Sequence, residues 1–168
     1  MRIVRIVVLT VAMAAWACTP VPPFKAYAYP SWGFAVSFRG APTVTDTPAA
    51  PDGSTAHTLL VESSLAGRDD LVNVIDGSSS AKSEDQALAD APATLAGSVG
   101  GTLGPITYAA TGETIGREFV LNRQGRPPAR VRIFVANKHL YELIAQSSLG
   151  TDDPETANFL TSFRLLGS

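Results

Sequence analysis

Residues 130–135, with the sequence RVRIFV, and residues 140–143, with the sequence LYEL, decide the predicted fold. Successive side chains of an extended strand point to opposite faces of its sheet. Val131 and Ile133 therefore share one face of the first segment, while Phe134 points to the other. A sheet with one face in water alternates apolar and polar residues, so apolar residues on both faces indicate a sheet that is covered on both sides.

Further strands are predicted outward from this pair, where β-branched and aromatic residues run between turn residues. The predicted strands cover residues 32–38, 57–64, 70–76, 105–110, 115–122, 129–136 and 140–146. Asn137 and Lys138 form a tight-turn signal between the last two strands. Residues 40–56 are rich in proline and glycine and are predicted to form a loop.

Two helices are predicted beside these strands. Ser83 and Gln86 form a capping-box pattern, and apolar residues then recur at three- and four-residue spacings up to Val99. Pro92 lies inside this helix and is expected to kink or split it, because its ring removes a backbone donor. Residues 152–155 (DDPE) combine a carboxylate cap with an early proline and start the second helix. The predicted class is α/β (α+β), with a central, mostly antiparallel sheet covered by helices on both faces.

Five segments carry a resemblance to a known family. They are residues 33–38 (GFAVSF), 116–119 (GREF), 130–135 (RVRIFV), 140–143 (LYEL) and 159–165 (FLTSFRL). Together they resemble the PsbP-like group, which includes the extrinsic photosystem II protein P, a yeast nuclear-import factor that binds the Ran GTPase, and a bacterial lipoprotein branch of unknown function. The resemblance implies an α/β/α sandwich. Members bind different partners, so it assigns no functional residue.

The N-terminus has the features of a secretion signal. Arg2 and Arg5 precede an apolar run over residues 6–16, which is short of the roughly 20 residues that a spanning helix needs. Residues 1–17 are therefore predicted to be a signal peptide. Ala17 before Cys18 resembles a bacterial lipobox, so Cys18 is the predicted lipidation site. Ordinary cleavage after Ala17 and an uncleaved membrane anchor are the alternatives.

Residues 18–30 are predicted to form a proline-rich tether between the lipidated cysteine and one PsbP-like domain at residues 31–168. Two or more acyl chains anchor a protein stably in a membrane. Thr19 stands where lipoproteins retained in the inner membrane carry Asp, so we expect an exported protein on the outer membrane, facing the periplasm. A soluble secreted or periplasmic protein is the alternative.

Charge and composition exclude some functions. The chain has 13 basic and 15 acidic residues and a net charge of −2. Loss of Arg2 and Arg5 with the signal peptide leaves 11 basic residues and a net charge of −4. A mildly acidic domain lacks the clustered Lys and Arg that nucleic acid requires. Cys18 is the single cysteine, so no disulfide forms within one chain.

One polar cluster is a candidate site. It comprises Arg117, Glu118, Arg130 and Arg132 on neighbouring predicted strands. Bidentate pairing of Arg with carboxylate across the strands is the favoured interpretation, and anion binding is the alternative. The two histidines, His57 and His139, lack metal-ligand spacing, and no GxSxG motif occurs. No catalytic, metal-binding or cofactor-binding residue is therefore predicted.

These features predict a non-catalytic envelope lipoprotein. Its membrane contact would be the lipid anchor, and its domain would bind an envelope partner protein or assist the assembly of a complex. A small-ligand-binding lipoprotein, for a lipid, sugar or anion, is the alternative, and an apolar pocket between helix and sheet would favour it. An envelope enzyme would need a cleft where Arg117, Glu118 or a histidine converge.

Overall fold

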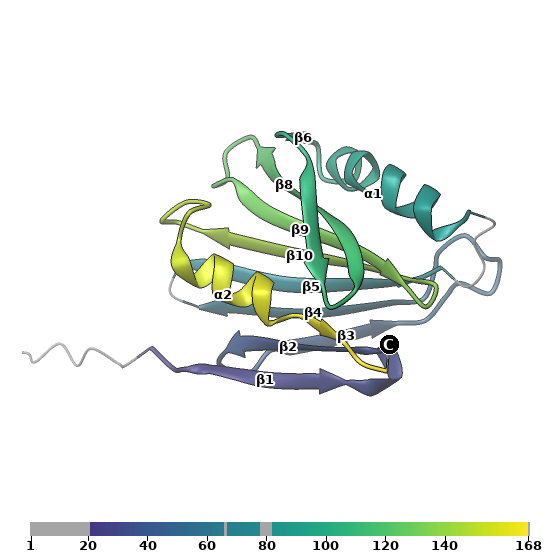
Figure 1. Cartoon of the computed structure of the whole chain (residues 1–168), viewed down its shortest axis with the longest axis horizontal. Coiled ribbons are helices and arrows are strands. Elements are labelled where there is room, and N and C mark those ends of the chain that lie inside the picture. Colours follow the sequence, from purple (N-terminus) through teal and green to yellow (C-terminus); the bar gives the residue numbers. More distant parts are fainter. Residues whose placement is uncertain (1–20, 66, 78–81, 168) are drawn as a thin grey trace, which may run out of the picture.

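The computed structural model describes residues 21–65, 67–77 and 82–167 (Figure 1). The helices are α1 (Glu84–Ser98) and α2 (Pro154–Ser162), and Pro30–Trp32 forms a 3-10 turn, η1. The strands are β1 (Phe24–Tyr29), β2 (Phe34–Arg39), β3 (Thr43–Thr47), β4 (Thr58–Leu65), β5 (Arg68–Asp76), β6 (Gly101–Leu103), β7 (Thr107–Thr111), β8 (Thr114–Arg123), β9 (Ala129–Ala136), β10 (His139–Ser147) and β11 (Arg164–Leu165).

The described strands form two sheets. In the main sheet the order is β3-β4-β5-β10-β9-β8-β6, with β7 paired to the other half of β8. In the second sheet the order is β1-β2-β11. Every pairing among the described strands is antiparallel. The predicted antiparallel character of the sheet is therefore confirmed.

α1 covers one face of the main sheet, over β6, β8 and β9 (Figure 1). Ser83 caps its start, and the capping box with Gln86 is formed in both directions. Leu95 packs there on the buried side chains of Phe119 and Val131. α1 leaves the same face of β4 and β5 uncovered by a helix, which creates the groove described below.

The other face of the main sheet packs on the second sheet and on α2. Phe34 and Phe38 of β2 join Tyr141 of β10 and Phe159 and Phe163 near the C-terminus in one buried cluster. The predicted sandwich with helices on both faces therefore needs correction. A three-stranded sheet with one short helix beside it covers this face, because the second helix has only nine residues and cannot span the sheet.

Two predictions about local structure were wrong. Phe24–Tyr29 is strand β1, so the domain begins before residue 31 and the predicted tether at 18–30 ends earlier. Thr43–Thr47 is strand β3 within the predicted loop. Both strands lie at a sheet edge. β3 has one apolar residue and is exposed along its length, whereas β1 is rich in aromatic residues but follows the prolines that indicated a tether. Pro92 does not split α1, which continues from Glu84 to Ser98 with Pro92 and Leu95 among its buried residues.

Other local predictions are confirmed. Asn137 and Lys138 both adopt positive φ, at 53° and 65°, as the tight turn between β9 and β10 requires. Asp153 caps α2 by accepting a hydrogen bond of 3.0 Å from the backbone N–H of Glu155. Val131 and Ile133 face α1, while Phe134 faces the second sheet.

Candidate functional site

The uncovered part of the main sheet beside α1 forms a groove. Three adjoining hollows of about 340, 430 and 260 Å³ lie between the helix and the strands β4, β5 and β10. The first two share Leu71, Val99 and Ile144, and the second and third share Ile75 and Thr94. We call this continuous hollow the α1 groove.

The middle of the α1 groove is apolar. Leu71 and Ile144 are paired neighbours on β5 and β10, so their side chains lie together on the sheet face. Val99, just after α1, overhangs them and is 40% exposed. Leu60 on β4 and Leu95 on α1 extend the strip. Apolar side chains left half in water along one line favour a binding surface.

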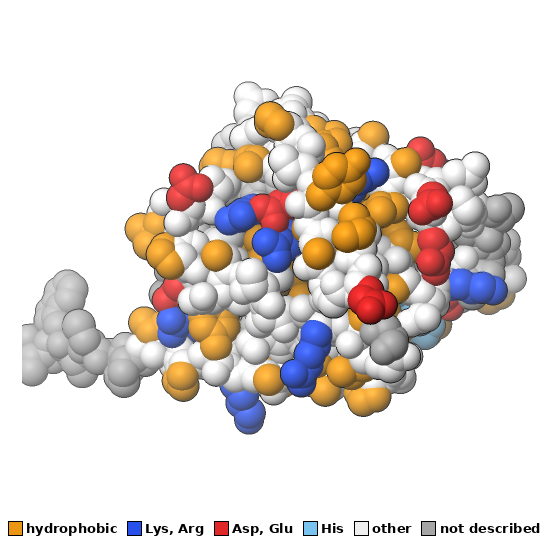
Figure 2. All heavy atoms as spheres, viewed as in Figure 1, with side chains coloured by type: hydrophobic (Ala, Val, Ile, Leu, Met, Phe, Trp, Pro, Cys, Tyr) orange, Lys and Arg blue, Asp and Glu red, His pale blue; other side chains and the backbone are white. Residues whose placement is uncertain are grey.

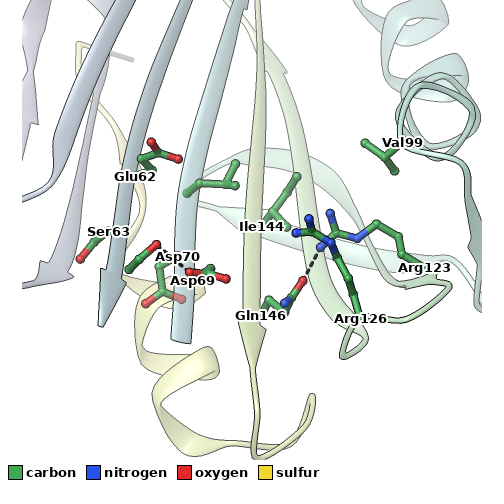
Figure 3. A pocket seen from close by; sticks show the side chains of 11 residues that line it. Glu62, Ser63, Asp69, Asp70, Val99, Arg123, Arg126, Ile144 and Gln146 are labelled. Carbon is green, nitrogen blue, oxygen red and sulfur yellow. Dashed lines mark hydrogen bonds between the residues drawn. The ribbon is translucent and has the colours of Figure 1, made fainter. Parts of the chain in front are cut away.

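One end of the α1 groove carries opposite charges on its two sides (Figure 3). Arg123 and Arg126 lie on one side of Ile144, and Glu62 and Asp69 lie on the other. Arg123 donates a hydrogen bond from its NH2 group to Gln146 Oε1. Its buried Nε has no hydrogen-bond partner among the described residues. This end therefore carries cations and carboxylates on opposite sides of the apolar strip.

Glu142 lies at the base of the groove. Its side chain is among the buried polar groups, at 4% exposure, and its Oε2 accepts a hydrogen bond of 2.8 Å from Asn73 Nδ2. Burial raises the pKa of Glu142, and the bond from Asn73 only partly opposes this. The raised pKa makes protonation of Glu142 easier than for a free carboxyl, and the protonated form is able to donate as well as accept hydrogen bonds.

The predicted polar cluster is only partly assembled. Arg130 donates to Glu118 Oε1 at 2.7 Å from Nε and 2.5 Å from NH2, and Arg132 Nε donates to Glu118 Oε2. Arg132 NH1 also donates to the carbonyl of Leu160, near the end of α2. Burial alone would raise the pKa of Glu118, but Arg132 and Arg130 hold it below its usual value. The three groups satisfy one another and attach α2 to the sheet.

Arg117 stands apart from that cluster. It points to the opposite face of β8, where its guanidinium lies 4.7 Å from the ring centre of Tyr108. Tyr108 is 77% exposed, so this cation–π contact lies on the surface. Arg117 and Glu118 are consecutive residues of one strand, so their side chains point to opposite faces of the sheet. The sequence alone was enough to predict this separation.

A more deeply buried ion network was missed by sequence reasoning. Arg68, at 7% exposure, donates to both oxygens of Asp70 at 2.9 Å and to Asp153 Oδ2 at 2.7 Å. Ser147 Oγ donates to the same Asp153 oxygen at 2.7 Å. Burial opposes the ionised form of Asp153, but the bonds from Ser147, Glu155 and Arg68 hold its pKa below its usual value. This network fixes the start of α2 and pairs both of its buried carboxylates with Arg68.

The two histidines come together although 82 positions separate them in sequence. His57 and His139 both pack on Trp32, with ring-centre distances of 4.6 and 5.6 Å. His57 Nε2 lies 2.6 Å from Asp46 Oδ1. Neither histidine lines the α1 groove. The described part of the chain holds no group of three His, Cys, Asp or Glu side chains placed for a metal ion.

Two predictions on the N-terminus concern residues that the structure does not describe. Cys18 and the signal peptide 1–17 lie outside the described residues. Among the residues that are described, no helix is long and apolar enough to cross a membrane.

The architecture defines the chain as a protein with a PsbP-like fold. Its antiparallel sheet matches the solution structure of cyanobacterial PsbP (CyanoP) from Synechocystis sp. PCC 6803 with a TM-score of 0.58. The match covers 91% of this chain and 98% of that chain, at 8% sequence identity. No family model matches the sequence, and no curated protein matches it. The predicted resemblance is confirmed at the level of fold, and the site has to carry the functional argument.

Proposed function

We propose that this chain is a non-catalytic binding protein of the bacterial envelope. In this proposal residues 1–17 direct export, Cys18 carries a lipid, and the PsbP-like domain holds a segment of an envelope partner protein in the α1 groove. The observation that carries the proposal is the groove itself, which joins an apolar strip around Leu71 and Ile144 to the charged end at Arg123.

The shape of the groove favours a protein segment. Three adjoining hollows run beside one helix, whereas a small-molecule site is a single concave pocket. A peptide with apolar side chains at intervals would cover Leu71, Val99 and Ile144 and remove their exposed surface from water. A carboxylate on that peptide would meet Arg123 and Arg126, and a basic side chain would meet Glu62 or Asp69.

A small amphipathic ligand is the second candidate. The central hollow, of about 430 Å³, lies within the roughly 300–1,000 Å³ of known ligand pockets. Glu142 and Asn73 at its base would supply the polar contact that fixes the orientation of such a ligand. The ligand class would be an apolar chain with one hydrogen-bonding head, because the remaining walls are largely aliphatic.

A photo-crosslinking amino acid at position 99 tests the leading proposal. The variant is expressed in the native host beside a control at Val44, which is 49% exposed on β3 and outside the groove. We expect one envelope protein to be captured from position 99 and not from position 44. The crosslinked segment, made as a synthetic peptide, should then bind the purified domain.

Two variants make that test specific. Leu71→Lys introduces a charge into the apolar strip, while its long stem is able to stay on the sheet and its head reaches solvent. Arg123→Ala removes the cation. Each should weaken peptide binding while leaving the melting temperature close to that of the wild type. Equal capture from positions 99 and 44 would reject the groove as the binding site. So would a peptide affinity that neither Leu71→Lys nor Arg123→Ala reduces. A lipid or other small molecule found by native mass spectrometry would support the second candidate.

A further inference from the structure

Three exposed aliphatic side chains gather at the end of the main sheet where the described chain begins. Val21, Leu65 and Leu149 are 54%, 36% and 83% exposed. All three line one shallow hollow of about 160 Å³. Figure 2 shows hydrophobic side chains on this side of the molecule, where the described chain begins. We call these three residues the exit patch.

Specific hydrogen bonds hold the exit patch in place. Arg39 NH1 donates to the carbonyl of Pro22 at 2.6 Å, which fixes the chain next to Val21. Ser148 N donates to the carbonyl of Gly67 at 2.9 Å and joins the turn after Leu65 to the turn that bears Leu149. Leu149 N donates to Ser147 Oγ at 3.1 Å. Leu149 is therefore presented to solvent by an ordered turn.

The charges around the exit patch are paired or lie at its border. Arg39 pairs with Glu155 at 2.5 Å, and Arg68 pairs with Asp153 at 2.7 Å. An apolar medium that approached the patch would therefore not have to desolvate an unpaired cation. Asp152, three residues after Leu149 in the chain, is exposed and acidic, which disfavours an anionic surface.

The position of Cys18 selects the occupant of the patch. Cys18 is three residues from Val21, and three extended residues span at most about 11 Å. A lipid on Cys18 would therefore keep Val21, the first residue of the exit patch, within about that distance of the membrane. Aliphatic side chains held at a bilayer interface sink into the boundary between headgroups and acyl chains.

We propose that the exit patch docks on the lipid surface, with Leu149 inserted, and that it holds the main sheet end-on to the membrane. The inference rests on the lipid anchor in the proposed function, and it adds an orientation. The α1 groove then opens sideways, parallel to the membrane, toward a partner in the same compartment. Binding is expected on zwitterionic lipid and is expected to change little with salt, because the patch is apolar.

A spin label tests the docking on the full lipidated protein. Cys18 is the only cysteine of the chain, and its thiol is blocked once it carries the lipid. The thiol introduced by Leu149→Cys is then the single free thiol for the spin label. The control is Ala49→Cys, which is exposed at the opposite end of the main sheet, beyond the pairing of Thr47 with Thr58. The labelled proteins are reconstituted in phosphatidylcholine vesicles. Collisions of the nitroxide with a water-soluble nickel complex and with oxygen are then measured.

We expect the label at position 149 to lose collisions with nickel severalfold relative to position 49, and to gain collisions with oxygen. Water-like values at both positions, on protein whose intact mass shows the lipid on Cys18, would overturn the docking and leave the anchor intact. An intact mass without lipid on Cys18 would overturn both. Immobilisation of the label at position 149 without vesicles, increasing with protein concentration, would assign the patch to a second copy of the chain and also overturn the proposal.

Discussion

Tyr141 on β10 donates a hydrogen bond of 3.0 Å from its hydroxyl to the backbone carbonyl of Trp32, 109 residues earlier in the chain. This bond joins the main sheet to the turn between β1 and β2 of the second sheet. Burial, with a smaller contribution from Glu84, raises the pKa of Tyr141 to about 12. Gly33 follows Trp32 with φ of 70°, and a Cβ there would lie 3.2 Å from the Tyr141 hydroxyl. Glycine is therefore required beside this contact.

Tyr141→Phe should destabilise the protein by about 1–2 kcal/mol, because the buried Trp32 carbonyl loses its donor. Chemical denaturation of both proteins measures the difference. Tyr108→Phe is the matched control, since Tyr108 is 77% exposed, and it should change stability by less than about 0.5 kcal/mol. Equal effects of the two substitutions would contradict the role assigned to the Tyr141 hydroxyl.

Gly116→Ala should destabilise the protein by about 1–3 kcal/mol, as overpacked cores do. A Cβ at Gly116 would lie 2.2 Å from the backbone oxygen of Ile133 and 2.5 Å from the ring of Phe134. Gly97→Ala is the control within α1, where nothing lies within 4 Å of the added atom. It should stabilise the protein by roughly 0.5–1 kcal/mol through helix propensity. Thermal and denaturant unfolding should give opposite signs for the two variants.

Arg68→Met should cost about 3–5 kcal/mol of stability, because it leaves the carboxylates of Asp70 and Asp153 buried without their cation. Asp90→Asn removes the exposed pair with Lys82 and should cost less than about 1 kcal/mol. Denaturant midpoints compare the two. A loss of stability below about 1 kcal/mol for Arg68→Met, the range of an exposed pair, would mean that the network does not hold the start of α2.

Glu142→Gln should stabilise the protein near neutral pH. Burial raises the pKa of Glu142 in the folded state, so the folded protein binds more protons than the unfolded chain between the ordinary value of 4.5 and the folded pKa. The contribution of this group to stability is present below 4.5 and is lost as pH rises through the folded pKa. Glutamine stays neutral at every pH, and its side-chain oxygen remains able to accept from Asn73.

Unfolding of Glu142→Gln and wild type at several pH values checks this prediction. The gap in stability should close below pH 4.5, where both side chains are neutral. Asp69→Asn, on an exposed side chain of the same sheet face, serves as the control for a general loss of negative charge. A gap that is absent near neutral pH, or one that widens on acidification, would show that Glu142 is ionised in the fold at little cost.

The local elements were predictable where a short-range pattern specifies them. The capping box of Ser83 and Gln86 needs only a three-residue spacing, and Asn137 and Lys138 need only a tight turn between two strands. The edge strands β1 and β3 were missed for different reasons. β3 is polar and exposed along its length, whereas the aromatic residues of β1 lie between prolines that indicated a tether. Their pairing with β2 and β4 supplies the order that their own residues do not specify.

The candidate site was largely beyond sequence reasoning. Glu142 sits between Tyr141 and Leu143 in a strand whose neighbours are apolar, and a charge at the centre of such a strand was the available signal. The polar cluster was half predicted, since Glu118 does pair with Arg130 and Arg132 while Arg117 lies on the other face. The groove could not be predicted, because its walls come from α1 and four separate strands, β4, β5, β8 and β10.

The sequence by itself determined the alternation of residues 130–135 and 140–143, the caps of both helices and the PsbP-like resemblance. These features depend on spacings of a few residues and on local backbone geometry. Only the tertiary structure decided which layer covers each face, where His57 and His139 meet, and where Val21, Leu65 and Leu149 gather. Those contacts join segments far apart in the chain, so they follow from the strand order and register that packing of the whole core selects.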